Sequence, residues 1–318
     1  MSSRFVVTGA TGFVGSAFVE ALVAATAGCE LVTLGRRRSP AASECRSVDL
    51  GGESIAPLGR ADVVVHIAAE KRDAARMQRV NVEGTRALLR AAADAGVSRF
   101  VLLSSVGVYG ARPGSGRVTE AFPHTPANEY ERTKDVAESE TIDFCAQAGI
   151  ECIVLQPSNV VGEHASGAVF PLLSLMRNVR RGRVVRVSAE ARANYVAVSD
   201  VAQALVLATL TPNLSGTLIV NEPMRLDDLL ARVADAVNAR APRLTMPPVL
   251  ARAAGAAGSV TERVLRRSLP LNRERVRDLM NSTWYDSGAL RAATGFAPAA
   301  LAATIQHLAH LYTIEGRL

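Results

Sequence analysis

The chain has 318 residues, of which 48 % are hydrophobic and 21 % are charged. These fractions are typical of soluble globular proteins, so they exclude a largely disordered chain. The length suits two domains, or one large domain with an appendage. The net charge of +6 is modest for this length and does not require a nucleic-acid partner.

The sequence lacks the usual signatures of metal sites, disulfide frameworks and membrane spans. The four cysteines form no CxxC pair and the five histidines form no HExxH motif, so we predict neither disulfides nor a metal site. The first residues do not have the pattern of a signal peptide. Apolar stretches are interrupted by Asp200 or Arg252 before they reach the roughly 20 residues needed to cross a bilayer. We therefore expect a cytoplasmic protein without a stable membrane span.

Short apolar runs alternate with helical patterns in the first half of the chain. The runs are apolar on successive residues, as expected for strands that helices cover on both faces. We predict strands at 5–8, 31–34, 63–68, 100–104 and 152–155, and helices at 14–25, 74–95 and 130–148. This alternation predicts the α/β class, with a doubly wound parallel Rossmann sheet.

The alternation loosens after Pro157. We predict strands around Val184, at 195–198 and at 217–220, and helices at 168–181, at 201–210 and from about Asp227, Pro248, Arg273 and Ala299. No linker separates two halves. We therefore expect residues 1–160 to form a dinucleotide-binding domain that also receives residues 194–212. Residues 161–318 would form most of a smaller, discontinuous and mostly helical substrate-binding region.

A glycine-rich loop joins the first predicted strand to the first predicted helix. Glycines at this place allow a tight turn and a close approach of the backbone to a pyrophosphate, while the helix N-terminus offers amide donors. The residues predicted to contact a dinucleotide are Gly9, Thr11, Gly12, Phe13, Val14 and Gly15. The alternative is a glycine-rich turn that serves packing only.

The residues after the second predicted strand favour NADP over NAD. An NAD site usually has Asp or Glu about 20 residues after the glycine loop, where the carboxylate binds the ribose hydroxyls. This chain instead has three successive arginines, among them Arg36 and Arg37, and guanidinium groups can pair with a 2′-phosphate. A solvated arginine loop is the alternative. Asp49 and Leu50 end the next strand-like segment and are predicted to meet the adenine, although Asp49 could equally be a plain turn residue.

A tyrosine and a lysine four residues apart open one of the predicted helices. Tyr130 and Lys134 share one helix face, so the ammonium can lie near the phenol oxygen. The ammonium and a positively charged nicotinamide would lower the phenol pKa from its usual value near 10, which would suit proton exchange with an alcohol or carbonyl. Only two of the 36 basic residues are lysines, which argues against a chance pattern.

Two serines end the strand predicted at 100–104. Ligands gather at the carboxyl ends of strands in open α/β sheets, and a hydroxyl there can donate to an oxygen on which charge develops. Ser104 and Ser105 are therefore candidates for contact with the substrate. Capping of the local backbone is the alternative role.

Motifs spread over most of the chain support the same interpretation. Beside the glycine loop they lie at 66–69, 81–85, 104–110, 130–134, 156–162, 194–202 and 294–298. Together they resemble the extended short-chain dehydrogenase/reductase family, the group of nucleotide-sugar epimerases, dehydratases and ketoreductases. The resemblance implies that Tyr130 is the acid/base, that Lys134 binds the nicotinamide ribose and that Ser105 donates to the substrate oxygen. It also implies cofactor contacts at Ala68, Ala69, Tyr130, Lys134 and Pro157, and substrate contacts at Ser104, Ser105 and Asn159.

Two positions depart from the family pattern. Gln156 stands where the family usually has arginine, and Ala197 lies in a segment that commonly reads V-H-V or V-Y-V. These departures leave the substrate contacts there open. The resemblance further implies a homodimer formed by the helices predicted at 74–95 and 130–148.

The residues after the active-site hydroxyl narrow the reaction. Sugar 4,6-dehydratases resemble this pattern but carry Asp and Glu where this chain has Val106 and Gly107, so dehydration is disfavoured. Our leading hypothesis is an NADPH-dependent 4-ketoreductase acting on a nucleotide-linked sugar. A nucleotide-sugar 4-epimerase with bound NAD(P), usually NAD, is the alternative. A reductase of a sterol-like or flavonoid-like ketone and a non-catalytic dinucleotide sensor are further alternatives.

Two basic clusters lie in the second half of the chain. The first contains Arg177, Arg180, Arg181, Arg183 and Arg186, and it would either bind a nucleotide diphosphate, with Arg180 as a substrate contact, or be a solvated helix end. The second contains Arg263, Arg266, Arg267, Arg273, Arg275 and Arg277. This second cluster suits a solvated face, and with the apolar stretch at 246–260 it could alternatively rest on an anionic membrane.

Overall fold

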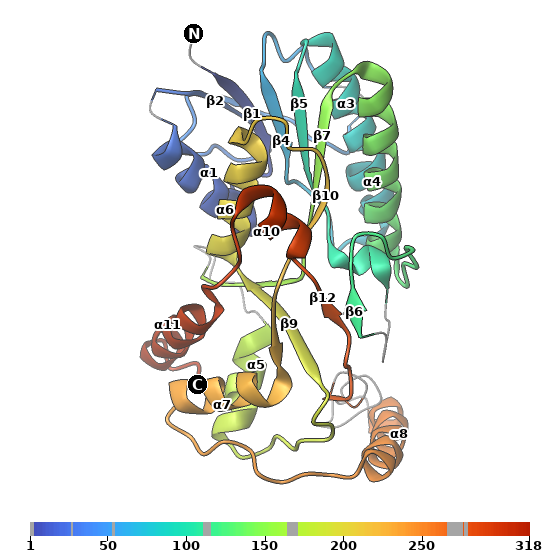
Figure 1. Ribbon diagram of the computed structural model, residues 1–318, viewed down its shortest axis with the longest axis vertical. Coiled ribbons are helices and arrows are strands. Elements are labelled where there is room, and N and C mark those ends of the chain that lie inside the picture. The colour runs from blue at the N-terminus through green and yellow to red at the C-terminus, as the bar shows by residue number, and fades with distance from the viewer. Residues whose placement is uncertain are drawn as a thin grey trace.

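The computed structural model describes residues 3–26, 28–52, 55–110, 116–163, 171–265, 276 and 279–318. Its upper part in Figure 1 is a parallel sheet with helices on its faces, and its lower part is mostly helical around a small sheet. None of the helices in these ranges is long and apolar enough to cross a bilayer.

Seven parallel strands form the central sheet, in the order β10-β7-β5-β4-β1-β2-β3. They are β1 (Arg4–Thr8), β2 (Glu30–Leu34), β3 (Glu44–Arg46), β4 (Val63–His66), β5 (Arg99–Leu103), β7 (Glu151–Pro157) and β10 (Gly216–Val220). The inner strands are buried almost throughout, which explains their unbroken apolar sequences. The strand order reverses between β1 and β4, and ligands in such sheets bind at the carboxyl ends of the strands beside that reversal.

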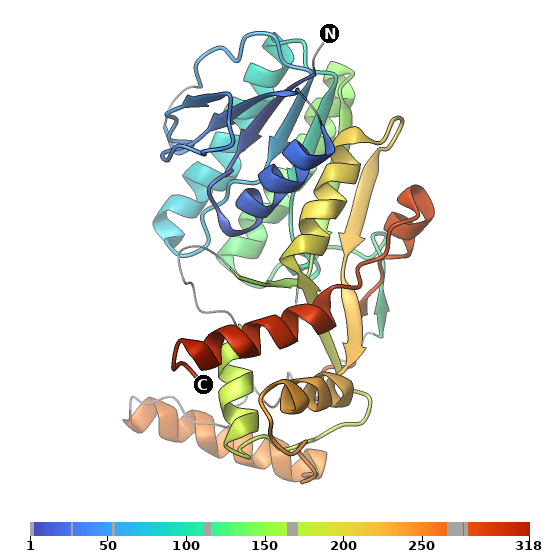
Figure 2. The same cartoon turned by 90° about the vertical axis from the view of Figure 1, so that its left-hand side faces the viewer.

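Helices cover both faces of this sheet (Figures 1 and 2). On one face α1 (Phe13–Ala25) packs against α6 (Val198–Leu210), and Phe18 belongs to the core beneath them. On the other face α3 (Gly84–Asp94) packs against α4 (Glu129–Ala148). The predicted doubly wound Rossmann fold is therefore confirmed.

The helix predicted at 74–95 is made of three consecutive pieces. They are α2 (Ala74–Met77), a π-helical segment (Gln78–Glu83) and α3. The π-helical segment contains the buried Asn81, whose amide donates to the carbonyl of Glu70 at 2.8 Å and accepts from its N–H at 2.7 Å. This segment therefore fixes the loop that follows β4.

The lower part contains a three-stranded sheet and packed helices. The strands are β8 (Asn159–Val161), β9 (Arg192–Ala197) and β11 (Glu222–Arg225), and the helices are α5 (Pro171–Arg180), α7 (Leu226–Ala236), α8 (Pro248–Leu265) and α11 (Leu301–Ile314). One apolar core joins α5, α7 and α11. Two carboxylates close the N-terminus of α11: Asp200 accepts from the N–H groups of Ala299 and Ala300, and Glu222 accepts from that of Leu301.

Several contacts tie the two parts together. The parallel pair β6 (Arg117–Val118) and β12 (Trp284–Tyr285) joins segments far apart in the chain, and α10 (Gly288–Thr294) follows β12. The buried Asn221, directly after β10, hydrogen-bonds Ser158, Asn194, Tyr285 and Ser287. The predicted division into two domains at about residue 160 stays a prediction.

One predicted element is wrong and others differ in extent. Among the described residues no strand lies around Val184; Arg186 makes only an isolated bridge to Thr245, and no described strand lies beside this segment to extend the pairing. The strand predicted at 63–68 ends at His66, and β9 covers 192–197 rather than 195–198. The start of the helix predicted at 168–181 and nearly all of the segment in which a helix from Arg273 was expected lie outside the described residues.

Candidate active site

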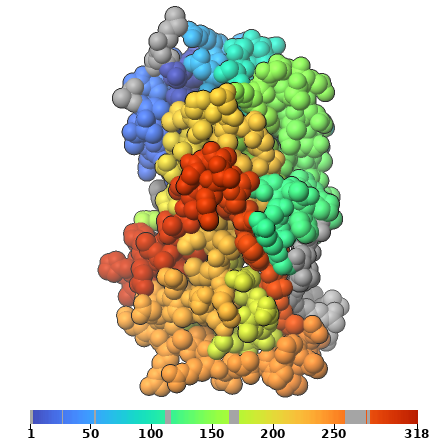
Figure 3. All heavy atoms as spheres, in the orientation of Figure 1, coloured from blue at the N-terminus to red at the C-terminus, as the bar shows by residue number. Residues whose placement is uncertain are grey.

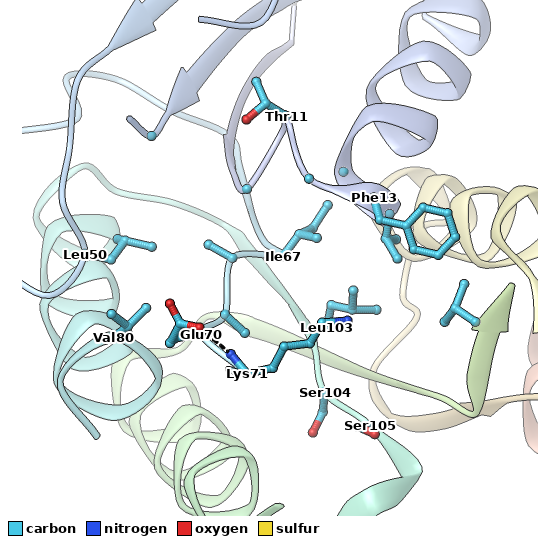
Figure 4. A pocket seen from close by; sticks show the side chains of 18 of the residues that line it. Thr11, Phe13, Leu50, Ile67, Glu70, Lys71, Val80, Leu103, Ser104 and Ser105 are labelled. Atoms are coloured by element: carbon cyan, nitrogen blue, oxygen red, sulfur yellow. Dashed lines mark hydrogen bonds between the residues drawn. The ribbon is translucent and has the colours of Figure 1, made fainter. Parts of the chain in front are cut away.

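A cavity of about 580 Å³ opens at the carboxyl ends of β1 and β4, where the strand order reverses. Figure 4 shows Thr11 and Phe13 of the glycine loop on one side of this cavity, and Ser104 and Ser105 on the other. The predicted residues that line it are Gly9, Thr11, Gly12, Phe13, Val14, Gly15, Arg36, Arg37, Asp49, Leu50, Ala68, Ala69, Ser104, Ser105, Tyr130, Pro157 and Asn159. The structure thus brings together almost all of the residues that the sequence singled out.

The glycine loop can pack this closely against its surroundings only because two of its residues lack side chains. A Cβ on Gly9, whose φ is +71°, would lie 2.7 Å from the amide nitrogen of Ala68. A Cβ on Gly15 would lie 2.0 Å from the carbonyl oxygen of Gly9. Helix α1 has no acidic residue in its first turn and no side chain caps it at Gly12. This loop and helix end therefore fit the diphosphate of a dinucleotide.

The far end of the cavity carries basic side chains. Arg36 and Arg37 line it after β2, and the guanidinium of Arg37 donates to the carbonyl of Thr11 at 3.2 Å. Asp49 lines the same end but forms an ion pair with Arg76 at 3.3 Å. Arginine therefore follows β2 where an NAD site usually has a carboxylate.

Lys134 lies beneath the cavity and is not among the residues that line it. It is buried, and its Nζ donates to the carbonyl oxygen of Leu103, the last residue of β5, at 2.6 Å. Burial lowers the pKa of Lys134 to about 8, although the neighbouring Glu138 opposes this shift. The lysine therefore holds α4 against the end of the strand that leads into Ser104 and Ser105.

Tyr130 lines the cavity, but its pKa differs from our expectation for the complete site. Burial, followed by the negative charge of Glu131, raises the pKa of Tyr130 to about 12. In the protein alone, the cost of burying a phenolate outweighs any attraction to the ammonium of Lys134. The predicted lowering of the Tyr130 pKa would thus need the positive charge of a bound oxidised cofactor.

The two serines after β5 have different surroundings. Ser105 caps the 3₁₀ turn Val106–Tyr109, since its Oγ accepts from the N–H of Gly107 at 3.1 Å. Its own hydroxyl proton can still be donated into the cavity. The Ser104 hydroxyl is buried and makes no hydrogen bond of good geometry with a described residue.

A buried polar network lies behind Ser104. The hydroxyl of Tyr109 donates to Gln156 at 2.6 Å, and the amide of Gln156 donates to Glu138 at 2.8 Å. Burial raises the pKa of Glu138, against the opposing effects of Ser104, Gln156, His124 and Lys134. Because Gln156 is uncharged, Glu138 does not receive the ion-pair partner that an arginine at this position would provide.

His66 organises the turn beneath the cavity. Its ring nitrogens hydrogen-bond Thr8 at 2.6 Å and Thr85 at 2.9 Å, and Thr8 also accepts from the N–H groups of Ile67 and Ala68. Burial, followed by the charge of Lys134, lowers the pKa of His66 to about 3. The imidazole is therefore neutral at physiological pH.

Sequence reasoning missed Lys71, which extends into the cavity in Figure 4. The rarity of lysine, which we applied to Lys134, would have identified it, since these two are the only lysines in the chain. Glu70 beside it accepts from the N–H groups of Lys71, Arg72 and Asp73 and so shapes the loop. Arg180, by contrast, is exposed at the end of α5 and does not line the cavity, so its substrate contact stays a prediction.

The fold and the site together define a Rossmann-type α/β protein with the tyrosine, lysine and serine arrangement of short-chain dehydrogenases/reductases. A family model described as "NAD dependent epimerase/dehydratase family" matches residues 5–220. The chain belongs to this family and is an enzyme of the extended short-chain dehydrogenase/reductase type.

Individual relatives agree with this assignment. The chain is 25 % identical, over 94 % of its length and 92 % of the relative's, to the N-acetyl-alpha-D-glucosaminyl-diphospho-ditrans,octacis-undecaprenol 4-epimerase of Escherichia coli O157:H7. It is 34 % identical to UDP-glucose 4-epimerase 4 of Oryza sativa subsp. japonica, over 52 % of each chain. The crystal structure of gox2253 superposes with a TM-score of 0.77 at 25 % identity and covers 100 % of both chains.

Proposed function

We propose that this protein transfers a hydride at carbon 4 of a nucleotide-linked sugar and that its overall reaction is 4-epimerisation. The observation that carries the proposal is one cavity lined by the glycine loop, Tyr130 and Ser105, with Val106 and Gly107 in place of a dehydratase's acid pair. Relatives named as 4-epimerases, one of them aligned over nearly the whole chain, support the choice of reaction.

The residues of the site have distinct roles in this reaction. When bound, NAD(P)⁺ supplies a hydride acceptor and a positive charge beside the phenol. Tyr130 takes the proton of the sugar 4-hydroxyl as the C4–H bond breaks, and returns it after the hydride comes back to the opposite face of the sugar. Ser105 donates a hydrogen bond to the same oxygen while it is a carbonyl. Lys134 fixes α4 against β5 and, as the resemblance implies, binds the nicotinamide ribose.

We infer that the cofactor is NADP. Arg36 and Arg37 line the end of the cavity beyond the glycine loop, where their guanidinium groups suit a 2′-phosphate. The same arginines favour the second candidate function, an NADPH-dependent 4-ketoreductase, because a reductase consumes NADPH in each turnover.

We also infer a homodimer through α3 and α4. Val136 and Ile142 on α4 are each 40 % exposed, although both side chains are large and apolar. A single monomer peak in size-exclusion chromatography with light scattering would contradict this inference.

The test is turnover of a UDP-hexose with and without net use of cofactor. The protein is incubated with UDP-glucose or UDP-N-acetylglucosamine and a catalytic amount of NADP⁺ or NAD⁺, and proton NMR follows the 4-epimer. We expect epimer to form without net absorbance change at the NADPH band. Stoichiometric loss of NADPH on a 4-ketosugar, with no epimer formed, would select the ketoreductase instead. Faster turnover with NAD⁺ would contradict the NADP proposal.

A further inference from the structure

We propose that the end of the molecule opposite the central sheet binds an anionic lipid bilayer. We call this end the basic apolar surface. It consists of three apolar residues, Leu244, Val249 and Leu250, and six arginines, Arg180, Arg181, Arg183, Arg240, Arg243 and Arg252. In both ribbon views α8 lies at this end. Figure 3, which shows the molecule in the orientation of Figure 1, places the orange part of the chain that includes α8 along the lower border.

The apolar part of this surface is unusual for the molecule. Leu244 is 74 % exposed, Val249 73 % and Leu250 59 %, and they fall within seven successive residues. Among the described residues only Ile314, at 71 %, is a comparably exposed large apolar side chain, and it stands alone. Single exposed apolar residues are common, whereas a cluster marks a contact surface.

The body of the protein holds this apolar segment in place. Ala251 on the opposite side of α8 is buried in a small core with Val187 and Val276. The N–H of Arg186 donates to the carbonyl of Leu244 at 2.9 Å, and the N–H of Met246 donates to that of Arg186 at 2.8 Å. Because one side of α8 is packed, its exposed side cannot turn inward without breaking these contacts.

The same hydrogen bonds bring the arginines to the apolar segment. Residues 176–187 contain five arginines and residues 236–261 contain three, and neither segment has an Asp or a Glu. Arg186 pairs with Asp227, and Arg177 donates to the carbonyl of Arg317. The six arginines of the basic apolar surface form no ion pair with another described residue. Their positive charge therefore remains available to a partner.

This combination fits an anionic bilayer better than a nucleic acid. A bilayer meets both kinds of side chain at once, since lipid phosphates pair with arginine while leucine and valine enter the boundary of the acyl chains. A single-stranded nucleic acid would pair with the arginines but would leave Leu244, Val249 and Leu250 without a partner. The segment 236–261 also has no aromatic side chain on which bases could stack.

The test is flotation of the full chain with vesicles of phosphatidylcholine, either alone or with about one third phosphatidylglycerol. We expect binding to the anionic vesicles only, and loss of that binding as added salt shortens the screening length. A variant with Arg240, Arg243 and Arg252 changed to Gln should bind roughly a hundredfold more weakly, at about fivefold for each basic residue. A variant with Leu244, Val249 and Leu250 changed to Gln should lose at least about tenfold.

The matched control is Ile314→Gln, which removes an equally exposed apolar side chain elsewhere and should bind vesicles like the wild type. Each variant is also checked by its thermal midpoint, and Leu244→Gln alone replaces the triple variant if that variant unfolds. Equal binding to both kinds of vesicle, or no binding to either, would overturn the proposal. So would a change from dimer to monomer in the Leu/Val variant with vesicle binding unaltered, because the surface would then be an interface between copies. Turnover of a UDP-hexose by the variant with Leu244, Val249 and Leu250 changed to Gln should equal that of the wild type. Failure of the lipid-binding proposal is therefore distinguishable from failure of the proposed function.

Discussion

The cavity end of the molecule and the end that carries α8 hold their charged side chains in different surroundings. Around the cavity, His66, Lys134 and Glu138 are buried, and burial is the largest cause of each pKa shift. At the other end the six arginines of the basic apolar surface are exposed and form no ion pair with a described residue. Burial shifts the pKa of a few groups around the cavity, whereas the exposed arginines stay charged and can pair with an anion outside the protein.

The two ends also differ in how much space they leave for a substituted side chain. At the cavity, a single added methyl group on Gly15 would overlap the backbone of Gly9. On the basic apolar surface the side chains of Leu244 and Val249 are nearly three-quarters exposed, so they have room to change. Substitutions should therefore reduce turnover or cofactor affinity at the first end and leave them intact at the second.

The largest expected effect is a loss of turnover when the candidate acid/base at the cavity is changed. Tyr130→Phe removes the hydroxyl that exchanges the proton, so kcat should fall by about 10²- to 10⁴-fold while cofactor affinity stays the same. Steady-state epimerisation and cofactor titration measure the two quantities. Tyr312→Phe is the control, because Tyr312 is a buried tyrosine in the core of the lower part and should leave kcat unchanged. Unchanged turnover in Tyr130→Phe would refute the assigned role.

A second comparison concerns the glycine loop. Gly15→Ala places a methyl group where the carbonyl of Gly9 lies, so the loop must shift and the affinity for NADP⁺ should fall roughly ten- to a hundredfold. Isothermal titration calorimetry measures this affinity. Ser16→Ala alters the next residue of α1 without such an overlap and should bind nearly normally. Normal affinity in Gly15→Ala would show that the diphosphate does not bind there.

A third test uses acid. The pKa of His66 is lowered from 6.5 to about 3, so the unfolded chain binds the additional proton as the pH falls through this range and the folded protein loses stability. Between pH 7 and pH 5 this loss should be about 2 kcal/mol. The side chain of His66→Gln binds no proton in this range. The free energy of unfolding of this variant, measured by urea denaturation, should therefore fall by about 2 kcal/mol less than that of the wild type between pH 7 and pH 5. Equal pH dependence in wild type and His66→Gln would contradict the prediction.

The smallest effect is expected in the lower part. Arg186→Gln removes the ion pair with Asp227, whose side chains are partly exposed, so the free energy of unfolding should fall by only about 1 kcal/mol. Urea denaturation measures this change. Arg181→Gln, which removes an exposed arginine that forms no ion pair with a described residue, is the reference and should be neutral. A loss of several kcal/mol in Arg186→Gln would mean that this end is as tightly organised as the cavity.

The sequence predicted the central sheet better than the lower part. The strands at 5–8, 31–34 and 100–104 agree with β1, β2 and β5 within one residue, because strands buried on both faces have continuous apolar sequences. The strands β6 and β12 have two residues each and exist only because distant segments meet, so no local pattern could indicate them. The polar edge strand β3 was indicated only as a strand-like segment that ends at Asp49 and Leu50, because its sequence Glu-Cys-Arg gives no apolar run from which to read its bounds.

The site was predictable to the extent that its chemistry lies in local motifs. The glycine loop and the pair Tyr130 and Lys134 are read within single segments, and the cavity contains or adjoins them. The direction of the pKa shift of Tyr130 in the protein alone was not predictable, because it depends on burial by several elements. The hydrogen bond from the ammonium of Lys134 to the carbonyl of Leu103 was not predictable either, because it joins α4 to the end of β5.

The position of β10 affects how the chain is assembled during synthesis. This strand pairs with β7 at the border of the central sheet, although about sixty residues that include α5, β9 and α6 separate the two in the chain. In a nascent chain that ends near residue 160, β7 can pair with β5 but its other edge stays unpaired, and other chains can add at that edge. We expect a fragment cut there to aggregate, and we expect any circular permutant that separates β7 from β10 to acquire its native fold late, after the final strand has emerged from the ribosome.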